Sequence, residues 1–473
     1  MKQLLKYIPS IETLVEFPEI SRYTGRFSKR FIVWLARKEA DKLRKEILEN
    51  KIPASSKKDE IHSMIKKNLI SRLKSYEKPN LCRVINGTGI ILHTNLGRAI
   101  LTEDAVKNLT SILSGYTNLE FDLKSGKRGN RLNLVEKELC FLTGAEAVHI
   151  VNNNAAGVFL SLNTLAYKKE VIVSRGQLVE IGDSFRMPEI MKKSGVKLVE
   201  IGTTNRTKLS DYENAITRKT GAILIVHTSN YKILGFTEET SIDSLVNLAK
   251  LSGLPLIYDL GGGVLFDLRQ FGLPYEPIVK ESLDKGVDIV TFSGDKVFGG
   301  PQCGIIAGKK EYIKKMRKNP ISRAIRCDKF ILSALEGTIR TYLKGDSGVK
   351  SLPTIKMLLQ DIDNLKKKGK YIIDNIDSKT KKYFNVTMDE CYGEMGSGAI
   401  PLEKIKSIAI KVSSNSFQAE DIAKSMRNNI PPIIGYIKDD TYHIDLRTIL
   451  SDELDEIIKA LNNLISSLDE NQT

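Results

Sequence analysis

The stretch TFSGDKVFGGPQCG, residues 291–304, decides how this 473-residue chain is interpreted. It continues the apolar run GVDIVTF at 286–292, which is typical of a buried β-strand, and then becomes a glycine-rich turn that holds Lys296. Such a strand would bring Lys296 to the carboxyl edge of a sheet, which is where open α/β folds place their ligands. The turn is therefore the first candidate for a site at which an amine takes part in chemistry.

A second apolar run, LPLIYDLGGG at 254–263, ends in a similar glycine turn and carries Asp259 to what should be the same edge. Enzymes that use pyridoxal phosphate (PLP) need a Schiff-base lysine and a carboxylate that keeps the pyridine nitrogen protonated. The alternative is an exposed turn lysine and a strand-end aspartate that caps the next helix. Because both residues occur in this order, we predict PLP as the cofactor and Lys296 and Asp259 as catalytic residues.

Apolar runs alternate with helical stretches through the middle of the chain. They lie at 145–151, 170–173, 197–201, 221–227, 254–258, 287–292 and 304–307. Continuous apolar runs separated by helices predict an α/β fold with a mostly parallel sheet covered on both faces. From about residue 346, the runs SIAIKVS, PIIGYI and YHIDLR and a last helix at 452–468 predict a smaller α/β domain. This is the aspartate-aminotransferase-like (fold type I) layout of PLP enzymes.

The polar turn NNNAAG at 152–157 is the predicted site for the cofactor phosphate. A strand, a polar turn and a helix N-terminus together form an anion site, because free backbone N–H groups and the positive end of the helix dipole face the turn. The alternative is an asparagine-rich helix cap that binds no phosphate. The side chains and backbone groups that we assign to the phosphate belong to Asn153, Asn154, Ala155, Ala156 and Ser293.

Positive charge is concentrated at the N-terminus. The whole chain has 72 Lys and Arg against 57 Asp and Glu, and residues 1–78 alone have 19 against 10. Apolar residues at helical spacing predict two helices there, near 32–47 and 61–73. A basic helical module of this kind is typical of a polyanion-binding domain, although a lysine-rich solvated surface is the alternative.

Domain boundaries follow from these changes in pattern. We expect a basic helical domain at 1–78, a linker at 79–97, a PLP-binding core at 98–345 and a small C-terminal domain at 346–473. The five cysteines form no CxxC pair, and the five histidines show no ligand spacing, so we expect reduced thiols and no metal. The chain lacks an export signal and an apolar window of 18 residues, so we expect a cytoplasmic protein with no membrane segment.

Three arginines lie in segments that could contact a ligand. Arg98 lies in the polar loop VINGTGIILHTNLGRAIL at 84–101, whose composition indicates backbone close to a ligand or another subunit. Arg323 and Arg326 would share one face of a helix spanning 321–343, and two guanidinium groups so placed can both bind one oxyanion. The alternative is that both are ordinary surface arginines.

Several motifs together point to one family. They extend from residue 84 to 448 and include VINGTGIILHTNLGRA, YTNLEFDLKSGKRGNR, TGAEAVHIVNNNAAG, SRGQLVEIGDSFRMP, YDLGGG, FSGDKVFGGPQCGIIAGKK, RAIRCDKFILSALEGTIRTYL and IDLRT. Through them the chain resembles the bacterial selenocysteine synthases, which are L-seryl-tRNA(Sec) selenium transferases. Its basic N-terminal module also resembles the tRNA-binding part of that family.

The resemblance implies a reaction and its partners. The enzyme would convert L-seryl-tRNA(Sec) to L-selenocysteinyl-tRNA(Sec) with selenophosphate, through a PLP-bound aminoacrylyl-tRNA. Lys296 would be the Schiff-base lysine and Asp259 the pyridinium partner, while Arg98, Arg323 and Arg326 would hold the phosphate of the selenium donor. The family forms homo-oligomeric rings of dimers with PLP sites at the dimer interfaces, so that Arg98 is placed to act in a neighbouring subunit.

Two other functions are compatible with parts of the sequence. A related PLP-dependent lyase that acts on a small amino acid or amino sugar phosphate would keep Lys296 and Asp259 without needing a basic module. A non-enzymatic tRNA-binding protein would keep the basic module without needing Lys296. Because the chain has both features, we favour the selenium transferase.

Overall fold

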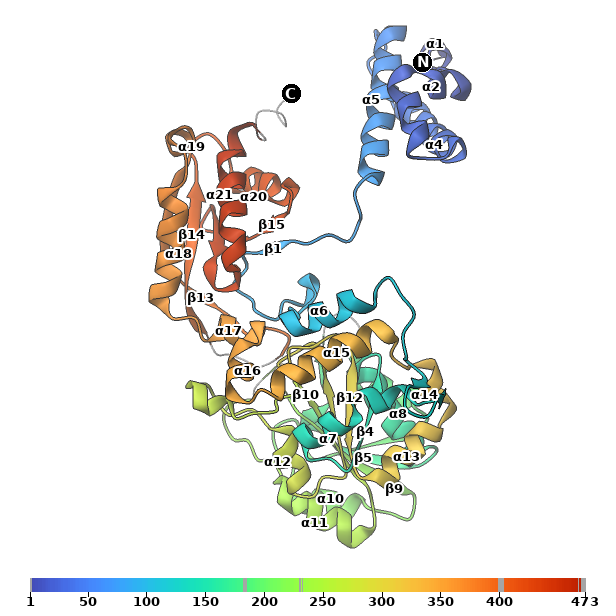
Figure 1. Ribbon diagram of the computed structural model, residues 1–473, viewed down its shortest axis with the longest axis vertical. Coiled ribbons are helices and arrows are strands. Elements are labelled where there is room, and N and C mark those ends of the chain that lie inside the picture. The colour runs from blue at the N-terminus through green and yellow to red at the C-terminus, as the bar shows by residue number, and fades with distance from the viewer. Residues whose placement is uncertain are drawn as a thin grey trace. The chain divides into compact units, whose positions relative to one another are not determined.

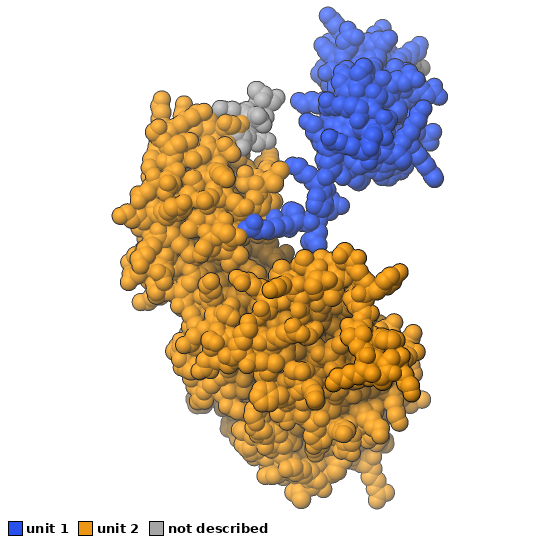
Figure 2. All heavy atoms as spheres, in the orientation of Figure 1, with its two compact units in different colours: residues 1–83 blue, residues 84–473 orange. Residues whose placement is uncertain are grey.

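The computed structural model describes residues 2–181, 185–228, 231, 233–398, 404–466 and 468. The chain forms two compact units, residues 1–83 and residues 84–473, which are coloured separately in Figure 2. Within the described ranges we find no helix that combines the length and the apolar character needed to span a bilayer.

The described part of the first unit consists of helices and the loops between them. Its helices are α1 (Lys2–Lys6), α2 (Ile11–Glu16), α3 (Pro18–Ser21), α4 (Lys29–Leu48) and α5 (Lys58–Tyr76). Helix α4 begins where the Ser28 side chain accepts a hydrogen bond from the Phe31 N–H, which satisfies one of the free donors of the first turn. The apolar stripes of α4 and α5 pack together, which confirms the two helices predicted from spacing.

A seven-stranded sheet organises the second unit (Figure 1). Its strands are β4 (Ala147–Val151), β5 (Glu170–Ser174), β8 (Lys197–Ile201), β9 (Thr220–Val226), β10 (Leu256–Gly261), β11 (Ile289–Ser293) and β12 (Gly304–Gly308). Their order is β4-β12-β11-β10-β9-β5-β8, and only β12 runs antiparallel to its neighbours. All seven apolar runs of the sequence thus form strands, and the mostly parallel sheet is confirmed.

Helices cover both faces of this sheet because successive strand residues point to opposite sides. One face packs against α8 (Asn154–Ala166), α9 (Met187–Lys193) and α13 (Lys310–Lys318). The other face packs against α7 (Glu136–Thr143), α11 (Ile242–Ser252), α12 (Val279–Asp284) and α15 (Lys329–Tyr342). Further helices are α6 (Glu103–Ile112), α10 (Leu209–Ala215), α14 (Pro320–Ala324), α16 (Asp346–Ser351) and α17 (Pro353–Leu358).

The C-terminal part has its own sheet and its own apolar cluster. Strands β13 (Asn385–Gly393), β14 (Ile405–Ser413), β17 (Thr441–Asp445) and β16 (Tyr436–Lys438) form an antiparallel sheet in that order. Helices α18 (Ile362–Asp374), α20 (Ala419–Asn428) and α21 (Leu454–Asn462) contact its strands or each other, and α19 (Ser378–Tyr383) adjoins β13. Among the described residues, β2 (Phe121–Asp122) also pairs antiparallel with β3 (Lys127–Arg128), and β6 (Glu180–Ile181) pairs antiparallel with β7 (Phe185–Arg186).

The segment expected as a linker, residues 79–97, is divided between the two units. Strand β1 (Ile85–Asn86) pairs in parallel with β15 (Ile433–Ile434) in the C-terminal part. Ile91 and Leu92 are buried in the main core, and the Leu92 N–H donates to the Met395 carbonyl at 2.7 Å. The second unit therefore begins at residue 84, within the expected linker.

Candidate active site

Lys296 lies in a closed, buried turn directly after β11. The Gly294 N–H donates to the Cys303 carbonyl at 2.9 Å, and the Gly300 N–H donates to the Gly294 carbonyl at 2.8 Å. Lys296 itself is only 7% exposed. Burial lowers the pKa of its amine, although the negative charge of Asp259 opposes that shift. A larger fraction of the amine is therefore neutral near pH 7 than in an exposed lysine.

Asp259 is held by donors from three different segments. It lies opposite Thr291 in the β10–β11 register, and the Thr291 hydroxyl donates to its Oδ1 at 3.0 Å. The Asn154 side-chain amide donates to the same oxygen at 2.7 Å, and the Gly261 N–H donates at 3.3 Å. Burial raises the pKa of Asp259, while these hydrogen bonds favour the charged form. The carboxylate is thus fixed in position close to Lys296.

The turn before α8 packs closely against the start of β12. Asn153 caps the helix, because its side chain accepts from the Ala156 N–H at 2.9 Å. A Cβ added to Gly304 would lie 2.2 Å from the Asn153 carbonyl oxygen, so glycine is required at this contact. The buried Oδ1 of Asn154 has no hydrogen-bond partner within the described chain. The helix N-terminus offers N–H donors to a phosphate, and the unpaired amide oxygen can accept from a protonated ring nitrogen. Both features beside Lys296 and Asp259 fit a phosphorylated pyridine.

Arg98 lies beside the lysine turn. Its Nη1 donates to Asp295 Oδ2 at 2.6 Å, and the Ala99 N–H donates to the Asp295 carbonyl at 3.2 Å. The positive charge of Arg98 is close enough to help lower the pKa of Lys296. Sequence reasoning did not identify Asp295, although its position directly before Lys296 in a glycine turn was an available signal.

The prediction of a single helix over residues 321–343 is wrong. Helix α14 ends at Ala324, and α15 begins only after Asp328, whose side chain accepts from the Ile331 N–H. Between them, Arg326 forms an antiparallel bridge with Val151, and the Asn152 N–H donates to the Ile325 carbonyl at 2.9 Å. These hydrogen bonds to the end of β4 replace the helical ones, so Arg323 and Arg326 do not share a helix face.

Arg323 and Arg326 nevertheless line one cavity of about 420 Å³. Its other basic lining residues are Arg128, Arg131, Arg317 and Lys318. Glu120 is the acid of this cavity, and it forms ion pairs with Arg128, Arg131 and Arg326. Arg98 is not among the lining residues, so within one chain the three predicted arginines do not meet.

His149 forms the buried wall of that cavity. Its Nε2 lies 2.7 Å from the Ser322 hydroxyl, and burial lowers its pKa to about 4. The imidazole is therefore neutral near pH 7 and adds no charge to the arginines around it. The strand run that contains His149 was predicted, but the contact with Ser322 depends on packing between residues 173 positions apart.

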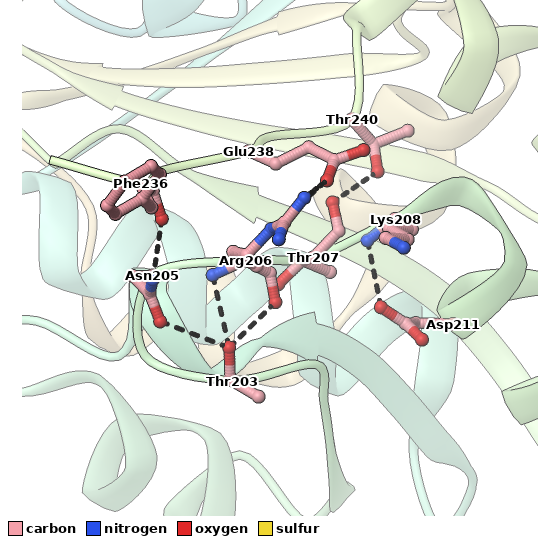
Figure 3. Close-up of polar contacts among 9 residues, drawn as sticks. All are labelled: Thr203, Asn205, Arg206, Thr207, Lys208, Asp211, Phe236, Glu238 and Thr240. Atoms are coloured by element: carbon pink, nitrogen blue, oxygen red, sulfur yellow. Dashed lines mark hydrogen bonds and ion pairs between the residues drawn. The ribbon is translucent and has the colours of Figure 1, made fainter.

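A polar loop follows β8, which is an edge strand of the same sheet. After β8, the loop around Thr203 and Asn205 is held to residues 236–240, as Figure 3 shows. Arg206 forms an ion pair with Glu238 at 2.6 Å, so its guanidinium group is already engaged. These contacts hold the loop in place, and none of the predicted site residues lies in it.

Known proteins are similar to this chain over nearly its whole length. The family model for L-seryl-tRNA selenium transferase matches residues 84–450. The L-seryl-tRNA(Sec) selenium transferase of Clostridium botulinum (strain Loch Maree / Type A3) is 44% identical over 464 residues, which cover 98% of this chain and 99% of that protein. The protein of the same name from Carboxydothermus hydrogenoformans is 44% identical over 455 residues, 96% of each chain.

A solved structure of D-glucosaminate-6-phosphate ammonia-lyase has the same fold. It superimposes with a TM-score of 0.54 at 21% identity and covers 84% of this chain and 99% of that chain. The aspartate-aminotransferase-like fold predicted from the sequence is thereby confirmed. With a family model that matches most of the chain and relatives that match nearly all of it, this protein belongs to the L-seryl-tRNA selenium transferase family.

Proposed function

We propose that this protein converts L-seryl-tRNA(Sec) to L-selenocysteinyl-tRNA(Sec), with selenophosphate as the selenium donor and PLP as the cofactor. The observation that carries the proposal is the buried pair of Lys296 and Asp259, in a chain that belongs to the selenium transferase family. When bound, PLP supplies an electron sink that stabilises negative charge at the substrate Cα.

The residues of the chain would hold the cofactor at three points. Asp259, fixed by Asn154 and Thr291, would present its carboxylate to the pyridine nitrogen. The N-terminus of α8 and the turn at Asn153 would bind the phosphate through backbone N–H groups, with Ser293 at the end of β11. We assign Ala155 and Ala156 to the phosphate through their backbone only.

Lys296 would move the proton. Because burial lowers its pKa, the neutral amine can accept the proton that leaves the seryl Cα. The resulting ammonium can then return that proton to the departing β-hydroxyl, which leaves as water. The turn from residue 291 to 300 is buried throughout, which keeps bulk water away from the amine.

The selenium donor is an anion, and we propose that arginines bind it. Arg323 and Arg326 line the basic cavity, while Arg98 is held by Asp295 beside Lys296. Because these two groups are separate within one chain, a homo-oligomer in which one subunit completes the site of another would unite them. We therefore propose a dimer-based assembly, with the ring of dimers as its larger form.

We propose that residues 1–78 bind tRNA(Sec), because the module has an excess of nine positive charges and folds as a helical unit of its own. The core at 98–345 and the small domain at 346–473 would then do the chemistry. Charged tRNA is made and used in the cytoplasm, so we propose that location for the protein.

The test is direct reconstitution. Purified protein, PLP, seryl-tRNA(Sec) and selenophosphate should yield selenocysteinyl-tRNA(Sec), and Lys296→Ala should abolish the product. Borohydride reduction followed by mass mapping should place the pyridoxyl group on Lys296. An adduct on a different lysine would refute the site assignment. Turnover of a small amino acid or amino sugar phosphate, with none of seryl-tRNA(Sec), would instead support the PLP-dependent lyase.

A further inference from the structure

The first helical unit has a strip of aromatic side chains on its surface. Phe27, Phe31 and Trp34 lie near the start of α4, and Tyr76 ends α5. The Phe31 ring lies 5.4 Å from Phe27, 5.7 Å from Trp34 and 5.0 Å from Tyr76, measured between centroids. Trp34 is 43% exposed and Tyr76 is 46% exposed. A large aromatic surface is thus open to contact on an otherwise charged module.

The cations next to this strip differ from those farther along α4. In the second half of the helix, the basic residues Lys42, Arg44 and Lys45 each form an ion pair with a nearby carboxylate. In the first half, no carboxylate of the described chain forms an ion pair with any of the four basic residues Lys29, Arg30, Arg37 and Lys38. Uncompensated positive charge therefore gathers around the aromatic strip.

The start of α4 is also unfavourable for these cations. Its first turn contains Lys29 and Arg30 and no acidic residue, although the positive end of the helix dipole favours acids there. Lys38 lies over the indole ring of Trp34, with its Nζ 4.1 Å from the ring centroid. An anionic partner would offset the repulsion between these cations and the positive end of the helix dipole. An aromatic partner would cover the exposed ring of Trp34.

We propose that this aromatic strip, with the four cations beside it, is the surface through which the unit binds RNA, and that an unpaired base stacks on Trp34. Proteins bind unpaired bases on aromatic rings while Lys and Arg neutralise the neighbouring phosphates. The duplex part of an RNA offers no free base face, so the contact is with a loop or another unpaired segment. This inference rests on the proposed function, in which residues 1–78 bind tRNA, and it names the surface and the chemistry.

Trp34 is the only tryptophan of the chain, so its fluorescence reports this surface alone. Titration of the intact protein with unacylated tRNA(Sec) should change the tryptophan emission in a saturable way. The midpoint should match the affinity from filter binding and should weaken as salt is raised. A tRNA that binds by filter assay and leaves the emission unchanged at saturation would overturn the proposal.

Variants of the intact protein separate stacking from charge. Trp34→Ala should weaken tRNA binding by about 5- to 150-fold, and Trp34→Phe should restore most of the loss because stacking needs only a ring. Lys38→Ala should lower the slope of log affinity against log salt by about one. The matched control is Lys45→Ala, a cation of the same helix that is 77% exposed and already paired with Glu49. It should leave the affinity within about twofold.

Thermal unfolding of each variant shows whether the unit stays folded. If Lys38→Ala and Lys45→Ala lose equal affinity for tRNA(Sec), the position of the positive charge on α4 does not matter. That result would refute the assignment of the aromatic strip as the RNA-binding surface. Emission that changes with protein concentration in the absence of RNA would also refute it, because another copy of the chain would then cover Trp34. If the protein makes selenocysteinyl-tRNA(Sec) while Trp34→Ala binds tRNA normally, this inference fails and the proposed function stands. Protein that binds no tRNA(Sec) at all would refute both.

Discussion

Replacing Gly304 by alanine tests the assignment of the phosphate site most sharply. The new Cβ would lie 2.2 Å from the Asn153 carbonyl oxygen, 2.5 Å from its carbonyl carbon and 2.9 Å from the Asn154 Cα. Ordinary contact begins near 3.4 Å, and all three neighbours are backbone atoms that cannot rotate away. The turn before α8 must therefore move by roughly 1 Å, and overpacking of this kind costs about 1–3 kcal/mol.

That displacement should act on the cofactor as well as on the fold. If the turn at Asn153 binds the cofactor phosphate, part or all of the strain will oppose binding, and 1–3 kcal/mol corresponds to an affinity weaker by about 5- to 150-fold. The assay is the visible absorbance of bound PLP during titration of cofactor-free protein, together with the unfolding midpoint. Gly262→Ala is the matched control, because its Cβ would meet only Val297 Cγ2 at 3.9 Å and the Leu260 carbonyl at 4.0 Å.

Two results would count against this reasoning in different ways. A Gly304→Ala protein that is destabilised but binds PLP normally would show that the turn is structural and does not hold the phosphate. A protein that is unchanged in both stability and cofactor affinity would show that the close contact with Asn153 is relieved without cost.

Three further predictions follow from the site and the units. Arg323→Ala and Arg326→Ala should each leave PLP bound and raise the selenophosphate concentration needed for half-maximal rate by roughly tenfold or more, and loss of PLP would move these arginines to the cofactor. Deletion of residues 1–78 should leave a PLP-loaded protein whose tRNA(Sec) affinity falls sharply in filter binding at two salt concentrations, whereas an insoluble or PLP-free product would indicate a module that only supports the core. Burial lowers the pKa of His149 from 6.5 to about 4, so the unfolded state binds a proton before the folded state does as the pH falls. Between pH 6.5 and 4, this difference should lower the free energy of unfolding by up to about 1.4 kcal/mol per pH unit. His149→Gln should flatten that part of the dependence of stability on pH, measured by urea unfolding. An unchanged pH dependence would show that His149 is not its cause.

Local sequence patterns were sufficient to predict many of the structural elements of this protein. The two N-terminal helices, the seven strands of the main sheet and the turn that holds Lys296 were all predictable from apolar spacing and glycine placement. These features depend on interactions within a few residues, so the order of residues alone determines them. The family followed from motifs that are themselves contiguous.

Local reasoning failed where a distant segment competed with it. Three-residue spacing put Arg323 and Arg326 on one helix, but a hydrogen bond from Asn152 to Ile325 and the bridge between Val151 and Arg326 break that helix. Composition made residues 79–97 look like a linker, but the pairing of Ile85 with Ile433 places part of that segment in the second unit. In both cases the backbone forms hydrogen bonds with a strand that is far away in the sequence, which a local pattern cannot predict.

The sequence by itself determined which residues stand at the ends of strands and which turn carries Lys296. Only the tertiary structure decided how they are combined. Asn154 was assigned to the phosphate from its helix cap, yet its side chain also holds Asp259 across 105 residues, and Thr291 does so across 32. The physical reason is that strand order and register depend on packing of the whole sheet, which no short window of sequence contains. The proton transfer that we propose for Lys296 depends in turn on that packing, because burial lowers the pKa of its amine.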